Sequence, residues 1–349
     1  MQSITVDGQP REFLLRQPPA VTGSATPMVI SIHGATGTAA GQQATSTFDQ
    51  GAVAMADSTA LTSIGAREGF IAVFPQATED SGRMWHSDPG SEDVAFVAAL
   101  TEYLHDNGCS SPSLTTVNGF SMGAMMTSRL LCVHPDLYAG GAMVAGALLP
   151  LAGCELPLRT KVLVVHGKAD EVVPYNGSLS PMLVAMAGPG SVSPVNRTLI
   201  AARWAKAKDC PSPGWASTGE ATVTDYSCPP STTLAVAGVR MTHTWDGPGV
   251  ATSELIWAVM APDQPCVPSE PAPPNPALAR AITARLAVDI AFRVRFGRVL
   301  TRQSTCEAQL AATLRSAIQS AVAADPLGPV AAQLRFALRE LARRPPATW

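Results

Sequence analysis

The sequence predicts an α/β fold in which a mostly parallel sheet is covered by helices on both faces. Short apolar runs with the composition of buried strands alternate with segments of helical periodicity through residues 1–261. Hydrophobic residues make up 46% of the 349 positions, which is enough for a large core. Because helices separate the strands, we expect neighbouring strands to run parallel.

Six predicted strands share a short, apolar sequence: 28–32, 70–75, 114–118, part of 137–147, 161–167 and part of 232–239. Four predicted helices lie between or after them: 92–105, 124–131, 196–208 and 253–260. The helix over 92–105 begins with acidic residues, which the helix dipole favours at that end.

The composition changes after residue 261. Residues 262–275 are rich in proline and are predicted to be a linker. Residues 276–349 contain eleven arginines, no lysine and four acidic residues, a formal charge of +7. Such an asymmetry is typical of a separate unit. We therefore expect a main domain over 1–261 and a basic, Ala/Arg-rich extension over 276–349 that is helical or partly disordered.

Charge and hydropathy exclude some classes of partner. The net charge of −3 favours no nucleic acid, and no apolar run is long enough to span a membrane. The N-terminus has neither the basic nor the apolar region of a secretion signal. The chain is therefore expected to be either intracellular or an exported protein whose signal has been removed.

Seven cysteines are scattered through the chain without a C-x-x-C pair, which argues against a zinc site. This distribution is typical of an exported enzyme with disulfides. Cys210 and Cys228 bracket a loop and form one candidate pair, and Cys132 and Cys154 form a second. The alternative is that the cysteines are reduced and buried.

The strongest motif is G-x-S-x-G, which Gly119, Ser121 and Gly123 form between a predicted strand and a predicted helix. A sharp turn in this context lifts the serine hydroxyl out of the sheet, where a base and a carbonyl group can both reach it. Ser121 is therefore the candidate nucleophile.

A serine nucleophile needs a histidine base and an acid that orients the histidine. Of six histidines, His243 alone follows Ser121 late in the chain, in a loop between the last predicted strand and the closing helix. Asp170 follows the strand over 161–167, and carboxyl ends of parallel strands meet at one edge of a sheet. Glu171 and Asp225 are weaker candidates for the acid.

Two further roles can be assigned to residues. Backbone N–H groups of Met122 and of either Ala35 or Thr36 are candidates for the oxyanion hole, which stabilises developing negative charge, and His33 would support the second loop. Trp85 and Trp245 are candidates for an aromatic wall of a substrate cleft, although tryptophans at such positions more often belong to the core.

Four segments together resemble the polyhydroxybutyrate depolymerase-like and feruloyl esterase group of α/β-hydrolases. They are His33-Gly34, residues 119–123, residues 166–175 and His243-Thr244-Trp245, and the resemblance covers about residues 1–262. Residues 6–12 resemble the first strand of this group, and Cys210 and Cys228 lie where its members often carry paired cysteines. The chain departs from the group's pattern at Ala124, Thr242 and Asp246, and the last two bear on substrate preference.

The resemblance implies an α/β-hydrolase catalytic domain, hydrolysis of carboxylic esters, secretion or a periplasmic location, and no metal or organic cofactor. The implied substrate is a small-molecule or polymeric ester, either a polyhydroxyalkanoate-type polyester or a feruloylated polysaccharide. Two alternatives are a peptidase of the prolyl-oligopeptidase type and a non-catalytic binding protein on a hydrolase scaffold. The oligomeric state is left open.

Overall fold

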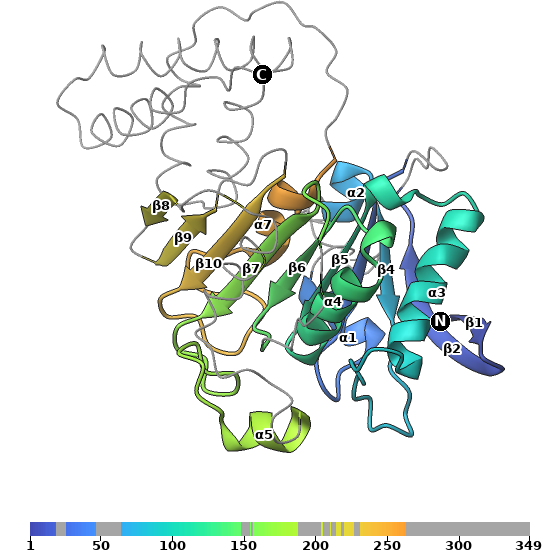
Figure 1. Cartoon of the computed structure of the whole chain (residues 1–349), viewed down its shortest axis with the longest axis horizontal. Coiled ribbons are helices and arrows are strands. Elements are labelled where there is room, and N and C mark those ends of the chain that lie inside the picture. The colour runs from blue at the N-terminus through green and yellow to red at the C-terminus, as the bar shows by residue number, and fades with distance from the viewer. Residues whose placement is uncertain are drawn as a thin grey trace, which may run out of the picture. The chain divides into compact units, whose positions relative to one another are not determined.

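The computed structural model describes residues 1–18, 26–46, 64–147, 154, 156–187, 204, 210, 214–217, 220–226 and 231–262 (Figure 1). The chain divides into two units, Met1–Pro262 and Asp263–Trp349. All described residues belong to the first unit. The predicted linker and basic extension lie outside the described residues, apart from Pro262, and remain predictions.

A single sheet of ten described strands forms the centre of the first unit, in the order β1-β2-β4-β3-β5-β6-β7-β10-β9-β8. The strands are β1 (Gln2–Val6), β2 (Gln9–Arg16), β3 (Met28–Ile32), β4 (Ile71–Pro75), β5 (Thr115–Phe120), β6 (Gly140–Val144), β7 (Lys161–Gly167), β8 (Gly214–Ser217), β9 (Ala221–Asp225) and β10 (Thr233–Gly238). The run from β4 to β10 is parallel, and both edges are antiparallel. The predicted fold class is therefore confirmed.

Helices cover both faces of this sheet. The α-helices are α1 (Ala39–Ser46), α2 (Ile64–Glu68), α3 (Glu92–Asp106), α4 (Met122–Val133), α5 (Pro181–Ala187) and α7 (Thr252–Met260). In Figure 1, α3 and α4 lie in front of the sheet, whereas α1 and α7 lie behind it. Every residue of β3, β4, β6 and β10 is buried, as expected for strands that have helices on both sides. Among the described residues, no helix has the length and apolar character needed to cross a bilayer.

The N-terminal segment forms a hairpin and not the single strand that the resemblance implied. Residues 6–12 were expected to belong to one strand, but the chain reverses at Asp7 and Gly8, and β1 pairs antiparallel with β2. Both turn residues have positive φ, 50° for Asp7 and 79° for Gly8, as the tight turn of a hairpin requires. The Asp-Gly dipeptide between two alternating segments is the sequence signal for this turn.

The other predicted elements agree with the observed ones to within a few residues, whereas α1, α2 and α5 were not predicted. The exception is the helix expected over 196–208, of which only Trp204 is described, as a buried helical residue. The strands β8 and β9 were not predicted.

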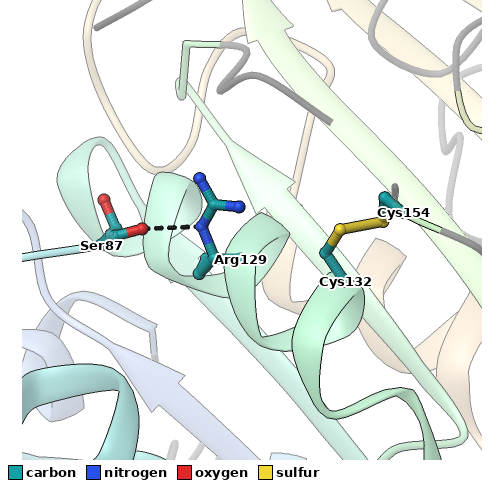
Figure 2. The surroundings of a disulfide bond; sticks show 4 residues. All are labelled: Ser87, Arg129, Cys132 and Cys154. Atoms are coloured by element: carbon teal, nitrogen blue, oxygen red, sulfur yellow. Dashed lines mark hydrogen bonds between the residues drawn. A yellow bond between two sulfur atoms is a disulfide. The ribbon is translucent and has the colours of Figure 1, made fainter. Parts of the chain in front are cut away.

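A disulfide joins the end of α4 to the segment before β7. Cys132 is bonded to Cys154, which confirms the second candidate pair (Figure 2). Cys109 is a free thiol, and Cys210 is disulfide-bonded. Cys228, the partner proposed for Cys210, lies outside the described residues. Figure 2 also shows Arg129 of α4, whose Nε donates to the carbonyl of Ser87 at 2.7 Å.

Candidate active site

Ser121 occupies a strained turn between β5 and α4. Its backbone has φ 53° and ψ −113°, a conformation that non-glycine residues rarely adopt. The glycines on either side are required by close packing. A Cβ atom on Gly119 would lie 2.2 Å from the carbonyl oxygen of Gly123, and one on Gly123 would lie 2.3 Å from the carbonyl oxygen of Ile32. The motif thus holds the serine at the tip of a turn that admits no side chain on either side.

The structure brings Ser121, His243 and Asp170 together. His243 Nε2 lies 3.0 Å from Ser121 Oγ, and His243 Nδ1 lies 2.8 Å from Asp170 Oδ2. The three residues follow β5, β7 and β10, whose carboxyl ends meet at the same edge of the sheet. The fold thus brings His243 into contact with Asp170, 73 residues earlier in the chain, and with Ser121, 122 residues earlier.

The carboxylate of Asp170 fixes the tautomer of His243. A carboxylate only accepts hydrogen bonds, so the proton of the neutral imidazole lies on Nδ1. The lone pair on Nε2 then faces the hydroxyl of Ser121. In this arrangement the imidazole can take the proton of the hydroxyl group, which is the function of a general base.

Asp170 is completely buried and accepts hydrogen bonds at both carboxylate oxygens. Oδ1 accepts from the backbone N–H groups of Val172 at 2.9 Å and Val173 at 2.8 Å. Oδ2 accepts from His243, and His166 Nε2 lies 3.2 Å from the same oxygen. Burial by itself raises the pKa of a carboxyl group, but the hydrogen bonds outweigh that effect and hold the pKa of Asp170 well below its ordinary value.

The loops that carry Asp170 and His243 are joined to each other. A Cβ atom on Gly167 would lie 2.0 Å from the carbonyl oxygen of Met241, so only glycine permits this approach. The Ala169 N–H donates to the same carbonyl at 3.1 Å. Asp170 and His243 therefore hold their relative position through backbone contacts as well as through their own hydrogen bond.

The loop after β3 approaches the nucleophile from the opposite side. A Cβ atom on Gly34 would lie 3.4 Å from Ser121 Cβ. The backbone N–H groups of Ala35 and Thr36, the two candidates from sequence, differ in whether they already have an acceptor. The Thr36 N–H donates to the Arg83 carbonyl at 3.1 Å. Among the described residues, no acceptor is found for the Ala35 N–H. Met122 is the first residue of α4, where backbone N–H groups have no acceptor within the helix.

His33 holds the conformation of this loop. The Ala77 N–H donates to His33 Nε2 at 3.2 Å, so the ring proton lies on Nδ1, which donates to the Gly34 carbonyl at 2.7 Å. Burial lowers the pKa of His33 and keeps the ring neutral. A peptide group points its C=O and N–H in opposite directions. The Gly34 carbonyl and the Ala35 N–H belong to the same peptide group. Because the carbonyl is hydrogen-bonded to His33, the Ala35 N–H points away from the His33 ring.

The two tryptophans do not form the wall of a cleft, which corrects the prediction. Trp85 is 1% exposed and Trp245 is 3% exposed, so neither has a face available to substrate. Trp85 Nε1 donates to the His33 carbonyl at 3.0 Å, and Trp245 Nε1 donates to Ser253 Oγ at 2.8 Å. Each indole packs in the core and anchors a loop of the site, because its polar edge needs a partner when buried.

Phe120 lies in the site and was missed by sequence reasoning. This half-buried residue precedes Ser121, and its ring centroid lies 4.9 Å from that of His243. A Cβ atom on Gly34 would lie 3.1 Å from Phe120 Cδ1, so the ring also borders the loop after β3. The available signal was an aromatic side chain at the variable position just before the serine.

Asp246, where the chain departs from the family pattern, forms a hydrogen bond with the closing helix. Its carboxylate accepts from the Thr252 N–H at 2.7 Å, in the first turn of α7. Carboxylates at this end of a helix interact favourably with its dipole. Asp246 thus ties the loop of His243 to the closing helix.

No protein-family model matches the chain. Among curated proteins, the putative esterase NocK of Nocardia uniformis subsp. tsuyamanensis is 29% identical over 266 residues, which cover 70% of this chain and 74% of that protein. Poly(3-hydroxyalkanoate) depolymerase C of Paucimonas lemoignei is 27% identical over 128 residues. That match covers 34% of this chain and 28% of the depolymerase.

The fold is also similar to that of a solved structure, an acetyl xylan esterase from Aspergillus awamori. The TM-score is 0.52 at 16% sequence identity, over 70% of this chain and 93% of the esterase. At this identity the likeness concerns the fold alone. By sequence and fold together, the chain is similar to esterases with the α/β-hydrolase fold, the group that contains polyhydroxybutyrate depolymerase-like enzymes and feruloyl esterases.

Proposed function

We propose that the chain is a serine carboxylic ester hydrolase in which Ser121, His243 and Asp170 form the catalytic triad. The observation that carries this proposal is the continuous chain of hydrogen bonds from Ser121 Oγ through the His243 ring to the Asp170 carboxylate. The pairing of a serine with a base, which is itself oriented by an acid, is the arrangement that activates a hydroxyl group for attack.

The first half of the reaction forms an acyl-enzyme. Ser121 Oγ attacks the ester carbonyl carbon as its proton moves to His243 Nε2, and a tetrahedral oxyanion forms. The C–O bond to the alcohol then breaks, and the alcohol leaves with the proton from Nε2. Asp170 stays ionised throughout and stabilises the imidazolium.

In the second half, water takes the place of the alcohol. The water molecule gives one proton to His243 Nε2 and its oxygen bonds to the acyl carbon. When the tetrahedral intermediate collapses, the bond to Ser121 Oγ breaks and the serine recovers its proton from Nε2. The products are a carboxylic acid and the free enzyme.

The oxyanion is stabilised by the backbone N–H groups of Met122 and Ala35. Met122 follows Ser121 at the N-terminus of α4, and Ala35 follows Gly34, whose Cβ position would lie 3.4 Å from Ser121 Cβ. Ala35 is preferred to Thr36 because the Thr36 N–H is already bonded to Arg83. Donors that are held in position before the reaction need no reorganisation when charge develops, which is the main source of their effect.

The proposed substrates are hydroxyalkanoate polyesters or feruloylated polysaccharides. The half-buried ring of Phe120 beside Ser121 offers a flat apolar surface to either kind of acyl group. Export to the periplasm or out of the cell is also proposed. The disulfide between Cys132 and Cys154 supports it, since such bonds persist in oxidising compartments.

The decisive experiment compares Ser121→Ala with the wild-type protein on p-nitrophenyl acetate and butyrate. The variant is expected to fold and to lose turnover, because it lacks the hydroxyl group that faces His243 Nε2. Ser113→Ala, which removes an exposed hydroxyl before β5, is the matched control and should keep wild-type rates. Wild-type turnover by Ser121→Ala would refute the proposal.

Two further measurements separate the competing functions. A fluorophosphonate probe should label the wild-type protein at Ser121, whereas a non-catalytic binding protein would stay unlabelled. Parallel rates on methyl ferulate, a hydroxybutyrate oligomer and a prolyl peptide would rank the substrate classes. Faster cleavage of the peptide than of every ester would favour the peptidase instead.

A further inference from the structure

A second histidine contacts the acid of the proposed triad. His166 is near the end of β7, and its side chain is 2% exposed. Its Nε2 atom lies 2.8 Å from the Val173 carbonyl oxygen and 3.2 Å from Asp170 Oδ2. His166 is the first residue of the segment 166–175 that carries the family resemblance, but neither that resemblance nor the proposed mechanism gives it a role.

The position of the proton on His166 follows from its partners. A carbonyl oxygen and a carboxylate can only accept, so Nε2 must carry a hydrogen, which the two acceptors share. His166 thus donates to the oxygen of Asp170 that also accepts from His243. The other oxygen, Oδ1, is held by backbone N–H groups of the same turn.

His166 contacts both the carboxylate of Asp170 and the backbone of the turn that follows Asp170. Val173 donates its N–H to Asp170 Oδ1 and offers its carbonyl to His166. His166 therefore acts on both carboxylate oxygens. It contacts Oδ2 directly, and it holds the backbone of Val173, which donates to Oδ1. Rotation of the carboxylate about its own axis would break bonds at both oxygens.

We propose that His166 is a positioning residue that fixes the Asp170 carboxylate for His243 and limits the negative charge that Oδ2 presents to it. This inference rests on the proposed function. A histidine that only filled the core would bond the Val173 carbonyl and would have no effect on the base. Within the part of the chain that the structure describes, two titratable groups near the ring are Asp170 and Tyr175, whose ring centroid lies 6.0 Å from that of His166.

Removal of the donor has two expected effects. The carboxylate loses one constraint on its orientation, so kcat falls while KM changes little, because the loss acts on the orientation of His243 through Asp170. The charge on Oδ2 is less neutralised, so the imidazolium of His243 is more stable. The lower pH midpoint of kcat/KM, which reports the base of the free enzyme, therefore moves upward.

The test compares His166→Leu and His166→Gln in the full chain with a nitrophenyl ester. Leucine removes the donor, whereas the glutamine amide can place an N–H near the position of Nε2. For His166→Leu, we expect kcat to fall on the order of 10- to 100-fold, by analogy with the loss of groups that orient metal-bound side chains, and we expect a raised pH midpoint. His166→Gln should recover most of kcat and the wild-type midpoint.

The matched control is His105→Leu. His105 is a half-buried histidine of α3 that bonds Thr115 Oγ1, so its loss removes a comparable side chain away from the triad. Its kcat and pH midpoint should be unchanged. If His166→Leu fails to fold, His166→Asn replaces it, since the shorter amide does not reach Asp170 and the same loss is expected.

The outcomes are distinct. Wild-type kcat and an unshifted midpoint in a folded His166→Leu or His166→Asn variant would overturn the inference, as would equal losses of kcat in the leucine and glutamine variants. If the wild-type protein hydrolyses no ester and Ser121 resists the fluorophosphonate, the proposed function fails instead. The two failures cannot be confused, because the second is read from the unmodified chain.

Discussion

The two sides of the candidate site are built from different chemistry. On one side, after β7 and β10, side chains carry the interactions: Asp170, His243 and His166 form a buried network around one carboxylate. On the other side, after β3, the interactions come from the backbone of the loop after His33. We call these the acid side and the oxyanion side.

Each side is braced by a buried histidine, but the two histidines hold opposite tautomers. His166 carries its proton on Nε2 because it faces a carbonyl and a carboxylate. His33 carries its proton on Nδ1 because a backbone N–H donates to its Nε2. The acid side therefore depends on charge, whereas the oxyanion side depends on the space left for a backbone turn. The predictions below test this distinction.

The largest effect is expected from Asp170→Asn, on the acid side. The amide removes the negative charge and can reverse the hydrogen bond to Nδ1, so His243 adopts the wrong tautomer. We expect kcat on nitrophenyl esters to fall on the order of 10⁴-fold, as for comparable changes in serine-hydrolase triads. Asp136→Asn, at an exposed position after α4, is the control. A loss of less than tenfold would show that charge on this side is not essential.

A smaller effect is expected from Gly34→Ala, on the oxyanion side. The added methyl would lie 3.1 Å from Phe120 Cδ1 and 3.4 Å from Ser121 Cβ, so the loop must shift by a few tenths of an ångström. Misplacement of oxyanion donors costs on the order of 10²-fold in kcat. The pH midpoint of kcat/KM should stay unchanged, since no charge is altered.

The control for this variant is Gly41→Ala in α1. There the methyl would meet only the flexible hydroxyl of Thr38, at 3.2 Å. Alanine is a better helix former than glycine, so stability should not fall. If both alanine variants kept wild-type kcat, the steric account of the oxyanion side would be wrong.

The smallest effect is a difference in pH dependence of stability between the two sides. The pKa of His33 is lowered from 6.5 in the folded state by burial, so the unfolded chain binds the proton more readily. Stability from the neutral ring is thus present above about pH 6.5 and is lost as the pH falls below it. The pKa of Asp170 is lowered from 3.8, so its contribution persists to about pH 4 and is lost only below that.

Urea unfolding from pH 8 to pH 3 can measure this difference. Relative to His33→Gln, the wild-type protein should begin to lose stability below about pH 6.5. Relative to Asp170→Asn, the loss should begin only below about pH 4. If stability began to fall at the same pH in both comparisons, two assignments would be contradicted. These are the buried neutral histidine on the oxyanion side and the buried ionised carboxylate on the acid side.

The sequence predicts the parts of the fold whose signals are local. The apolar runs that became β3, β4, β5, β7 and β10 are buried strands because helices cover both sheet faces, and this composition is visible without the structure. The hairpin at Asp7 and Gly8 had a local signal too, in the Asp-Gly dipeptide, but the segment was assigned to a single strand. The strands β8 and β9, the last two at one end of the sheet, are short and have no comparable apolar run.

Within the candidate site, residue type and chain order singled out Ser121, Asp170 and His243, and the fold brings these three within hydrogen-bond distance. Other residues could not be judged from their type. A tryptophan reads the same whether it lines a cleft or anchors a loop, and only burial separates the two for Trp85 and Trp245. His166 likewise carried no sign of its contact with Asp170, which exists because the chain turns back between them.

The sequence by itself determined the parallel α/β architecture, the turn that presents Ser121 and the order of serine, acid and histidine, because each depends on residue types over short stretches. Only the tertiary structure favours Ala35 over Thr36 as the proposed oxyanion donor, since the Thr36 N–H donates to the Arg83 carbonyl. The tautomers of His33 and His166 were decided in the same way. A proton on an imidazole goes to the nitrogen that faces an acceptor, and acceptors are placed by the fold.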